Sequence, residues 1–186
     1  GLVLVDDWFS PNEHIADYFN ECANNVFFAT PDNEFGTQIP TERGYVGIHT
    51  YFFNSGFANR REYLSVPLNQ TLIAGNEYCI SFKVSLAEES QFSIDAMGVF
   101  LSDQDPRDLD LFTVTPQVEH QNSEDLKIKD GWYSITEEYT AVGGERFLTI
   151  GNFNSIISIQ FGLRWDFSVL RLSSIINLNS NLNLNN

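Results

Sequence analysis

The chain of 186 residues is poor in the residues that most metal sites and hydrolytic sites use. Cys22 and Cys79 are its only cysteines, and neither belongs to a CxxC or CxxH pattern, which argues against a zinc site. The 3 histidines lie outside any HExxH motif, no serine lies in a GxSxG elbow, and no glycine-rich phosphate loop is present. We therefore expect no enzyme, and we leave open only a carboxylate pair for glycoside hydrolysis among the 25 acidic residues.

Positive charge is also scarce. Lys and Arg together number 10, so the net charge is −15, which argues against nucleic acid and anionic membranes as partners. An acidic surface suits a neutral or cationic ligand, a divalent metal, or simple solubility. No stretch reaches the roughly 18 apolar residues of a transmembrane helix. The opening GLVLV is too short for a secretory signal and lacks a basic flank, so no signal peptide is visible in this chain.

Aromatic residues are abundant: 16 Phe, 7 Tyr and 3 Trp. These side chains favour pleated, half-buried surfaces, which predicts an all-β protein. Short alternating segments separated by turn residues predict a two-sheet antiparallel β-sandwich over residues 1–172, followed by an Asn-rich polar tail or linker over 173–186. The segments with the strand pattern are Gly44–Phe53, Arg61–Leu68, Glu77–Glu88, Gln91–Ser102, Leu111–His120, Gly131–Phe153 and Ser155–Leu172.

Two of these segments have faces of different character. The alternation in EYCISFKVSL predicts a core face with Tyr78, Ile80, Phe82, Val84 and Leu86, and a polar face that looks outward or lines a shallow groove. In GYVGIHTYFF, Val46, Ile48, Thr50 and Phe52 form the predicted core face. The opposite face carries Tyr45, His49 and Tyr51, which either stack on a sugar or lie beneath the aromatic N-terminal segment.

Carboxylates suggest two calcium sites. The loop DQDPRDLD offers Asp103, Asp105, Asp108 and Asp110, and calcium takes six to eight oxygen ligands. A solvated acidic turn is the alternative, because the loop lacks the glycine and terminal glutamate of an EF-hand. A second candidate combines Asp6, Asp7 and Asp166. Glu62 alternates with core residues, so we expect its inward carboxylate to pair with an arginine.

Several ordered blocks carry a family resemblance. REYLSVPLNQTLIAGNEYCISFKVSLAEESQFSIDAMGVFLS, followed by GWYSITEEYTAVGGERFLTIGNF, resembles jelly-roll modules of the carbohydrate-binding-module type, with DYFNEC and RGYVGI as further matches. The resemblance covers roughly Trp8 to Phe153 and is greatest to the modules ahead of OmpA-like peptidoglycan-binding or sorting domains in Gram-negative cell-surface proteins. It implies a jelly roll of the galactose-binding type, export to the envelope and a role in binding or adhesion.

The resemblance also sets expectations for individual residues. Trp132 resembles the family's strand-opening tryptophan, which belongs to the core, so Tyr133 points the other way and joins the candidate ligand-binding residues. Cys22 and Cys79 lie in family-like blocks, and export supplies an oxidant, which implies a disulfide rather than two free thiols. The closing RWDFSVLRL has Phe167 where the family has a second aspartate, which weakens the case for a structural calcium ion at Asp166.

The leading hypothesis is an exported, non-catalytic module that binds a glycan or a protein at the cell surface, in association with the outer membrane. The alternative from another class is a structural spacer that positions a downstream envelope domain through the Asn-rich tail. A glycan-active hydrolase is the third. The sequence does not indicate the oligomeric state.

Overall fold

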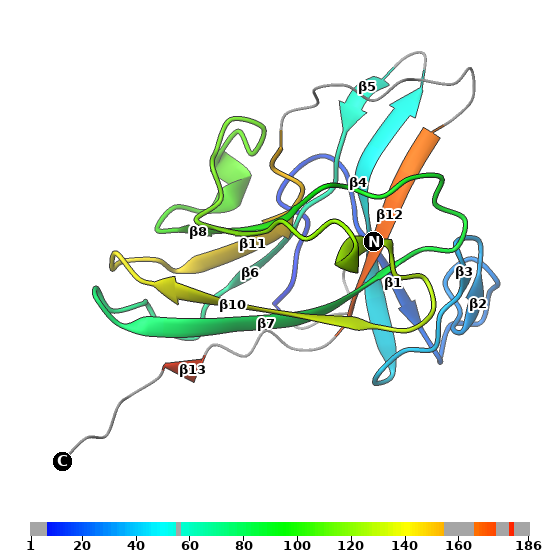
Figure 1. The fold of residues 1–186 in the computed structure, drawn as a ribbon, viewed down its shortest axis with the longest axis horizontal. Coiled ribbons are helices and arrows are strands. Elements are labelled where there is room, and N and C mark those ends of the chain that lie inside the picture. The colour runs from blue at the N-terminus through cyan, green and yellow to red at the C-terminus, as the bar shows by residue number, and fades with distance from the viewer. Residues whose placement is uncertain (1–6, 55–56, 155–165, 174–178, 181–186) are drawn as a thin grey trace.

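The computed structural model describes residues 7–54, 57–154, 166–173 and 179–180. In these residues the chain forms β-strands and two helical turns of three residues, η1 (Pro106–Asp108) and η2 (Asp125–Lys127). Every pair of neighbouring strands is antiparallel. The prediction of an all-β antiparallel sandwich is therefore confirmed (Figure 1). No helix in the described part of the chain is long and apolar enough to cross a membrane.

The larger sheet has the strand order β1-β4-β12-β7-β10, with β5 added to β4 and β13 added to β7. Its strands are β1 (Asp17–Asn20), β4 (Gly44–Asn54), β5 (Phe57–Arg60), β7 (Glu77–Leu86), β10 (Tyr133–Thr140), β12 (Asp166–Ser173) and β13 (Asn179–Ser180). The C-terminal β12 lies in the middle of this sheet, between β4 and β7. The polar segment after residue 173 contributes β13, which pairs with β7 at Tyr78 and Cys79.

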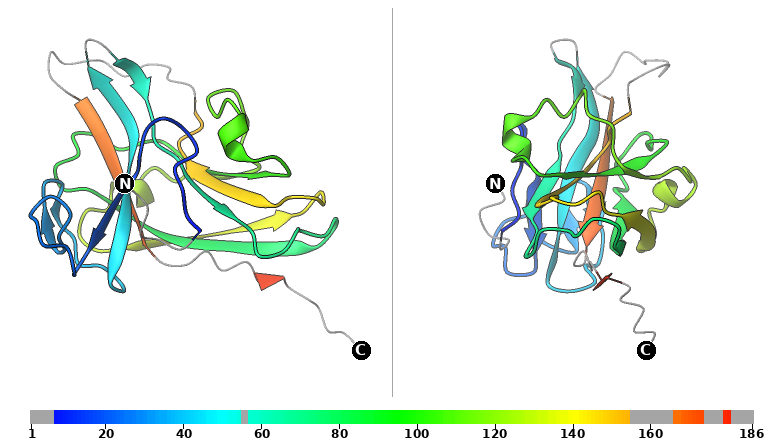
Figure 2. Two further views of the ribbon diagram at one scale, coloured as in Figure 1. Left: turned by 180° about the vertical axis from the view of Figure 1, so that it is seen from behind. Right: turned by 90° about the vertical axis from the view of Figure 1, so that its left-hand side faces the viewer.

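The smaller sheet has the order β6-β11-β8-β9. Its strands are β6 (Leu64–Pro67), β8 (Met97–Ser102), β9 (Val118–His120) and β11 (Phe147–Gly151). A separate hairpin of β2 (Asp32–Asn33) and β3 (Gly36–Thr37) lies at one end of the molecule, beside β1 and β4 (Figures 1 and 2). This hairpin belongs to the aromatic N-terminal segment.

The core lies between the two sheets, as the alternation predicts. Ile80, Phe82 and Val84 on β7 are buried in the same cluster as Ile48 on β4. The smaller sheet contributes Leu148 and its neighbours from the opposite side. Burying such side chains stabilises the fold by about 1.5–3 kcal/mol each, before the entropic cost of ordering the chain.

The turn from β10 to β11 has its own polar support. Gly143 and Gly144 have φ angles of 94° and 101°, a backbone region that glycine enters without steric cost. The buried Glu145 carboxylate accepts hydrogen bonds from the Tyr139 hydroxyl at 2.5 Å and from the amides of Val142 and Gly143, each at 2.9 Å. The VGG turn that the sequence indicates is thus held by a side chain from within the turn.

Candidate functional site

The face predicted to stack on sugar is covered in the structure. Tyr45 and Tyr51 each expose 2 % of their surface. The Phe19 ring stacks on Tyr45 with 5.2 Å between centroids, and the edge of Phe35 meets His49 at 5.8 Å. The N-terminal segment thus lies over Tyr45 and His49, as the alternative interpretation of the sequence predicts, while Phe92 packs against Tyr51. A ligand has no access to either tyrosine ring for stacking in this arrangement.

Gly47 explains how the N-terminal segment comes so close. It lies between Tyr45 and His49 on the outward face of β4, and a Cβ atom there would be 2.9 Å from the Phe19 ring. Without a side chain at this position, β1 can pair with β4 while the Phe19 ring lies next to Gly47 and stacks on Tyr45. Close backbone approach of this kind is a common reason for glycine inside a strand.

Trp132 and Tyr133 exchange the positions predicted for them. Tyr133 pairs with Val84 and packs against the core cluster, so its assignment as an outward ligand-binding residue is corrected. Its ring also contacts His120, at 5.9 Å. Trp132 instead reaches over the outward face, where it is half-buried and its ring meets Tyr45 at 5.6 Å. The reason is strand alternation: Tyr133 shares its face of β10 with the buried Ile135.

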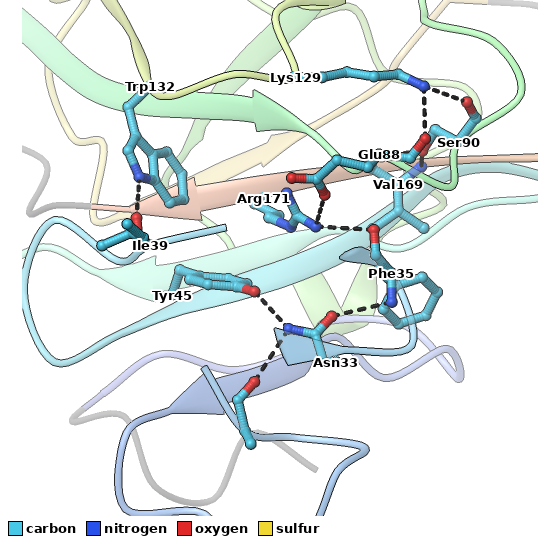
Figure 3. Close-up of polar contacts among 11 residues, drawn as sticks. Asn33, Phe35, Ile39, Tyr45, Glu88, Ser90, Lys129, Trp132, Val169 and Arg171 are labelled. Atoms are coloured by element: carbon cyan, nitrogen blue, oxygen red, sulfur yellow. Dashed lines mark hydrogen bonds and ion pairs between the residues drawn. The ribbon is translucent and has the colours of Figure 1, made fainter. Parts of the chain in front are cut away.

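Trp132 is fixed by a hydrogen bond. Its indole Nε1 donates to the carbonyl of Ile39 at 2.7 Å, which joins the start of β10 to the segment after β3 (Figure 3). In the same view Asn33 donates from Nδ2 to the Tyr45 hydroxyl at 2.7 Å. These two hydrogen bonds fix Trp132 and the β2–β3 hairpin in place over the outward face of the sheet.

A buried arginine lies beneath this cover. Arg171 on β12 exposes 1 % of its side chain, and its guanidinium lies 5.6 Å from the centre of the Tyr45 ring. Nη2 donates to the Phe35 carbonyl at 2.9 Å and forms an ion pair with Glu88 (Figure 3). An uncompensated buried charge is costly, so this pair and the ring contact make the position tolerable.

Lys129 anchors the loop that carries Glu88. Its ammonium donates to the carbonyls of Glu88 at 2.7 Å and Ser90 at 2.9 Å (Figure 3). The Ser90 hydroxyl in turn accepts from the amide of Val169 on β12 at 3.0 Å. The chain after β7 is therefore tied to the centre of the sheet, and Glu88 is held next to Arg171.

The outward faces of β7 and β10 remain partly open beside Trp132. Ser134, Thr136 and Glu138 on β10 are exposed, and Ser81 and Lys83 on β7 are half-buried. These five residues are called the polar strip below. The hydroxyls of Ser81 and Thr136 are 3.2 Å apart. The prediction of an outward polar face on β7 holds at these positions.

Glu62 is buried as predicted, but among the residues that the structure describes its partner is the backbone of His49 and not an arginine. Its Oε2 accepts from the backbone amide of His49 at 2.9 Å, and its own amide donates to the His49 carbonyl at 2.8 Å. Burial, and secondarily the nearby Asp17 carboxyl, raises the pKa of Glu62 from its ordinary value near 4.5 to about 7. Burial, with the charge of Arg60 adding to it, lowers the pKa of His49 to about 4.

The acidic loop forms a capped turn. Asp105 caps η1 by accepting from the amide of Arg107 at 3.0 Å and also pairs with its guanidinium, while Asp110 accepts from the amide of Phe112 at 3.1 Å. Asp103 contributes its backbone carbonyl to Arg146. In the residues that the structure describes, no three His, Cys, Asp or Glu side chains gather to hold a metal ion. Asp103, Asp105, Asp108 and Asp110 are thus not gathered into one cluster in this structure, and calcium binding by this loop stays a prediction.

The second calcium candidate is only partly visible. Asp7 is exposed and has a φ angle of 62°, whereas Asp6 and the side chain of Asp166 lie outside the described part of the structure. This site stays a prediction.

The predicted disulfide is wrong, because both cysteines are free. Cys22 follows β1 and is exposed, and Cys79 is half-buried on β7. The strands β4 and β12 lie between β1 and β7. Three strand spacings amount to about 14 Å, and bridged cysteines need their Cα atoms within about 7 Å.

Sequence reasoning missed a histidine between two carboxylates. His120 on β9 has Nδ1 at 2.9 Å from Glu137 of β10 and Nε2 at 3.0 Å from Asp125 of η2. These contacts join the edges of the two sheets. No local pattern identifies the trio, since its members come from three separate elements.

Comparisons with known proteins identify the fold. No protein-family model matches the chain, and no curated protein does. The K1 cleaved adhesin domain of Lys-gingipain from Porphyromonas gingivalis W83 matches 96 % of this chain and 93 % of its own, with a TM-score of 0.54 and 16 % identity. A CBM4 structure matches 94 % of this chain and 95 % of its own, with a TM-score of 0.47 and 11 % identity. The chain therefore has the β-sandwich fold of the adhesin domain.

Proposed function

We propose that this protein is a non-catalytic module that binds a glycan on the outward face of the larger sheet, at Trp132 and the polar strip. The half-buried indole of Trp132 is the observation that carries the proposal, since the rings of Tyr45 and Tyr51 on the same face are buried. A flat aromatic ring stacks on the apolar face of a pyranose, and neighbouring polar groups hydrogen-bond its hydroxyls.

The polar strip suits this chemistry. Trp132 directly precedes β10, and Ser134 and Thr136 follow it at alternate positions, on the face of β10 opposite Tyr133 and Ile135. Ser81 and Lys83 lie beside them on β7. Hydroxyls both donate and accept, and an ammonium donates, which matches the mixed demands of sugar hydroxyls. The adhesin fold of the similar structure is consistent with binding at the cell surface after export, which we include in the proposal.

A glycan-array screen, followed by titration calorimetry on each hit, tests the proposal. Trp132→Ala should weaken binding about tenfold, because an aromatic contact contributes roughly 1–1.5 kcal/mol. Phe27→Ala is the matched control, since Phe27 is an exposed aromatic outside the site. Retained binding by Trp132→Ala would place the ligand elsewhere. Screening with and without calcium tests, in the same experiment, whether glycan binding requires this ion.

Burial of Tyr45 and Tyr51 favours a second candidate, a spacer that positions a downstream envelope domain. A spacer requires a rigid, well-covered fold and no ligand. If the array gives no hit with either calcium condition, the spacer function is preferred over glycan binding.

A further inference from the structure

Arg171 has more hydrogen-bond donors than the described residues satisfy. Its guanidinium carries five N–H groups, and Nη2 alone makes the contacts to the Phe35 carbonyl and the Glu88 carboxylate. Nε and Nη1 are buried and have no acceptor in the described part of the chain. Leaving such charged donors unpaired is unfavourable, so the site is built for a further acceptor.

Ser85 adds a third polar atom at the same place. It lies directly opposite Arg171 in the pairing of β7 with β12, so the two side chains share the outward face. Ser85 is 1 % exposed, and its Oγ has no partner among the described residues. A carboxylate binds a guanidinium at two points through Nη2 together with either Nη1 or Nε. A group that took the place of Glu88 on Nη2 would therefore also pair with one of these two unpaired nitrogens, with the serine hydroxyl as a further donor.

Glu88 indicates which kind of group this is. Its carboxylate is the acceptor that already pairs with Arg171, and it is the more accessible partner, at 28 % exposure against 1 %. It contacts the guanidinium through Nη2 alone, whereas arginine binds carboxylates best through two parallel hydrogen bonds. An external carboxylate that displaces Glu88 would gain the two-point contact that Glu88 does not make.

The surroundings connect this guanidinium to the glycan site. Tyr45 contacts the Trp132 ring on one side and the Arg171 guanidinium on the other (Figure 3). Lys83 on β7 pairs with Ser173, two residues after Arg171, and Lys129 from the loop before β10 bonds the Glu88 carbonyl; the whole chain has only 10 Lys and Arg. A positive site in an otherwise acidic protein fits a ligand with one localised negative group.

We infer that the glycan is acidic: its uronic-acid carboxylate binds Arg171 and Ser85 in place of Glu88, while a sugar ring stacks on Trp132. This inference rests on the proposed function and names its substrate class. Glu88 acts as an internal competitor: it pairs with Arg171 when no such carboxylate is bound.

Calorimetry with a short oligogalacturonate and with its neutral methyl ester tests this. The acid should bind about tenfold more tightly than the ester, which corresponds to 1.4 kcal/mol. Glu88→Gln should strengthen binding of the acid severalfold and leave the ester unchanged, because the competing charge is removed. Glu89→Gln is the matched control, because Glu89 is exposed next to Glu88, whereas Arg171 pairs with Glu88 and Phe35. Ser85→Ala should weaken binding of the acid only.

The outcomes separate this inference from the proposed function. Equal binding of acid and ester, both dependent on Trp132, overturns the acidic-ligand inference and leaves glycan binding intact. Unchanged binding of the acid by Glu88→Gln overturns the role of Glu88 as competitor, and with it the inference. Absence of binding by both probes and by the neutral glycans of the array overturns both proposals.

Discussion

Tyr51 lies on the face of β4 opposite the core residues Ile48 and Thr50, where strand alternation alone predicts an accessible ring. It is nevertheless 2 % exposed, and Phe92 packs against it with 5.6 Å between ring centroids. The same is true of Tyr45, which lies under Phe19. Both faces of β4 are therefore buried. Truncating a side chain on either face should lower the free energy of unfolding.

Tyr51→Ala should lower the free energy of unfolding by about 3–5 kcal/mol, the usual cost of truncating a buried aromatic ring. Ile48→Ala on the core face should cost about 2–5 kcal/mol. The similar size of the two effects is the signature of a strand buried on both sides. Urea unfolding followed by circular dichroism measures both, with the exposed Val142→Ala as the control. A Tyr51→Ala variant as stable as the parent would show that this face is not part of the packed interior.

At the scale of the element, β4 has three different partners along its outer edge, and the last of them is β5, which pairs at Phe52 and Asn54. The first half of β4 pairs with β1, and at His49 the edge is taken by Glu62, whose amide and carboxylate together replace a neighbouring strand. Glu62 and His49 are thus coupled through the backbone. Asp17, His14 and Arg60 are the other charged groups that influence the pair.

The two groups have opposite effects on stability. The pKa of Glu62 is raised to about 7 in the folded state, so its contribution is fully present below pH 4.5 and is lost as the pH rises through 7. The pKa of His49 is lowered to about 4, so stability is lost as the pH falls below 6.5. Each amounts to about 3 kcal/mol at 1.36 kcal/mol per pKa unit. Between pH 4.5 and 6.5 they offset one another.

Glu62→Gln should therefore make the protein acid-sensitive. The amide oxygen still accepts from the His49 amide, but the stabilising uptake of a proton by Glu62 is gone and the loss from His49 remains. Urea unfolding at pH 5 and pH 7 should show a larger drop for the variant than for the parent, by about 2–3 kcal/mol. Parallel pH profiles for the two proteins would show that Glu62 does not titrate in this range.

For the whole molecule, the separation of β1 from β7 decides the state of the cysteines. Thiol titration of the denatured, unreduced protein should find two free thiols, because Cys22 and Cys79 are too far apart to bridge. In the folded protein Cys22 should react first, since it is exposed and Cys79 is half-buried. A protein without free thiols in the monomer would mean that β1 lies elsewhere.

Sequence patterns predicted the strands and the core face well. The alternation over Glu77–Leu86 was enough to assign Ile80, Phe82 and Val84 to the interior, because the period of a strand is local. The VGG turn is also predictable from local sequence, because Gly143 and Gly144 adopt positive φ angles that glycine allows without steric cost. For Trp132 and Tyr133 the family resemblance predicts the reverse of the observed orientations, whereas the alternation of Tyr133 with the buried Ile135 predicts the observed ones.

The sequence by itself determined the fold class and the inward faces of β4 and β7, because hydrophobic periodicity acts within one element. The tertiary structure alone decided what covers the outward face. The N-terminal segment packs on β4 through Phe19 only because Gly47 leaves room, and Arg171 meets Glu88 and Phe35 only because β12 enters the middle of the sheet. These contacts join residues far apart in the chain, and their formation depends on strand order, which no local pattern encodes.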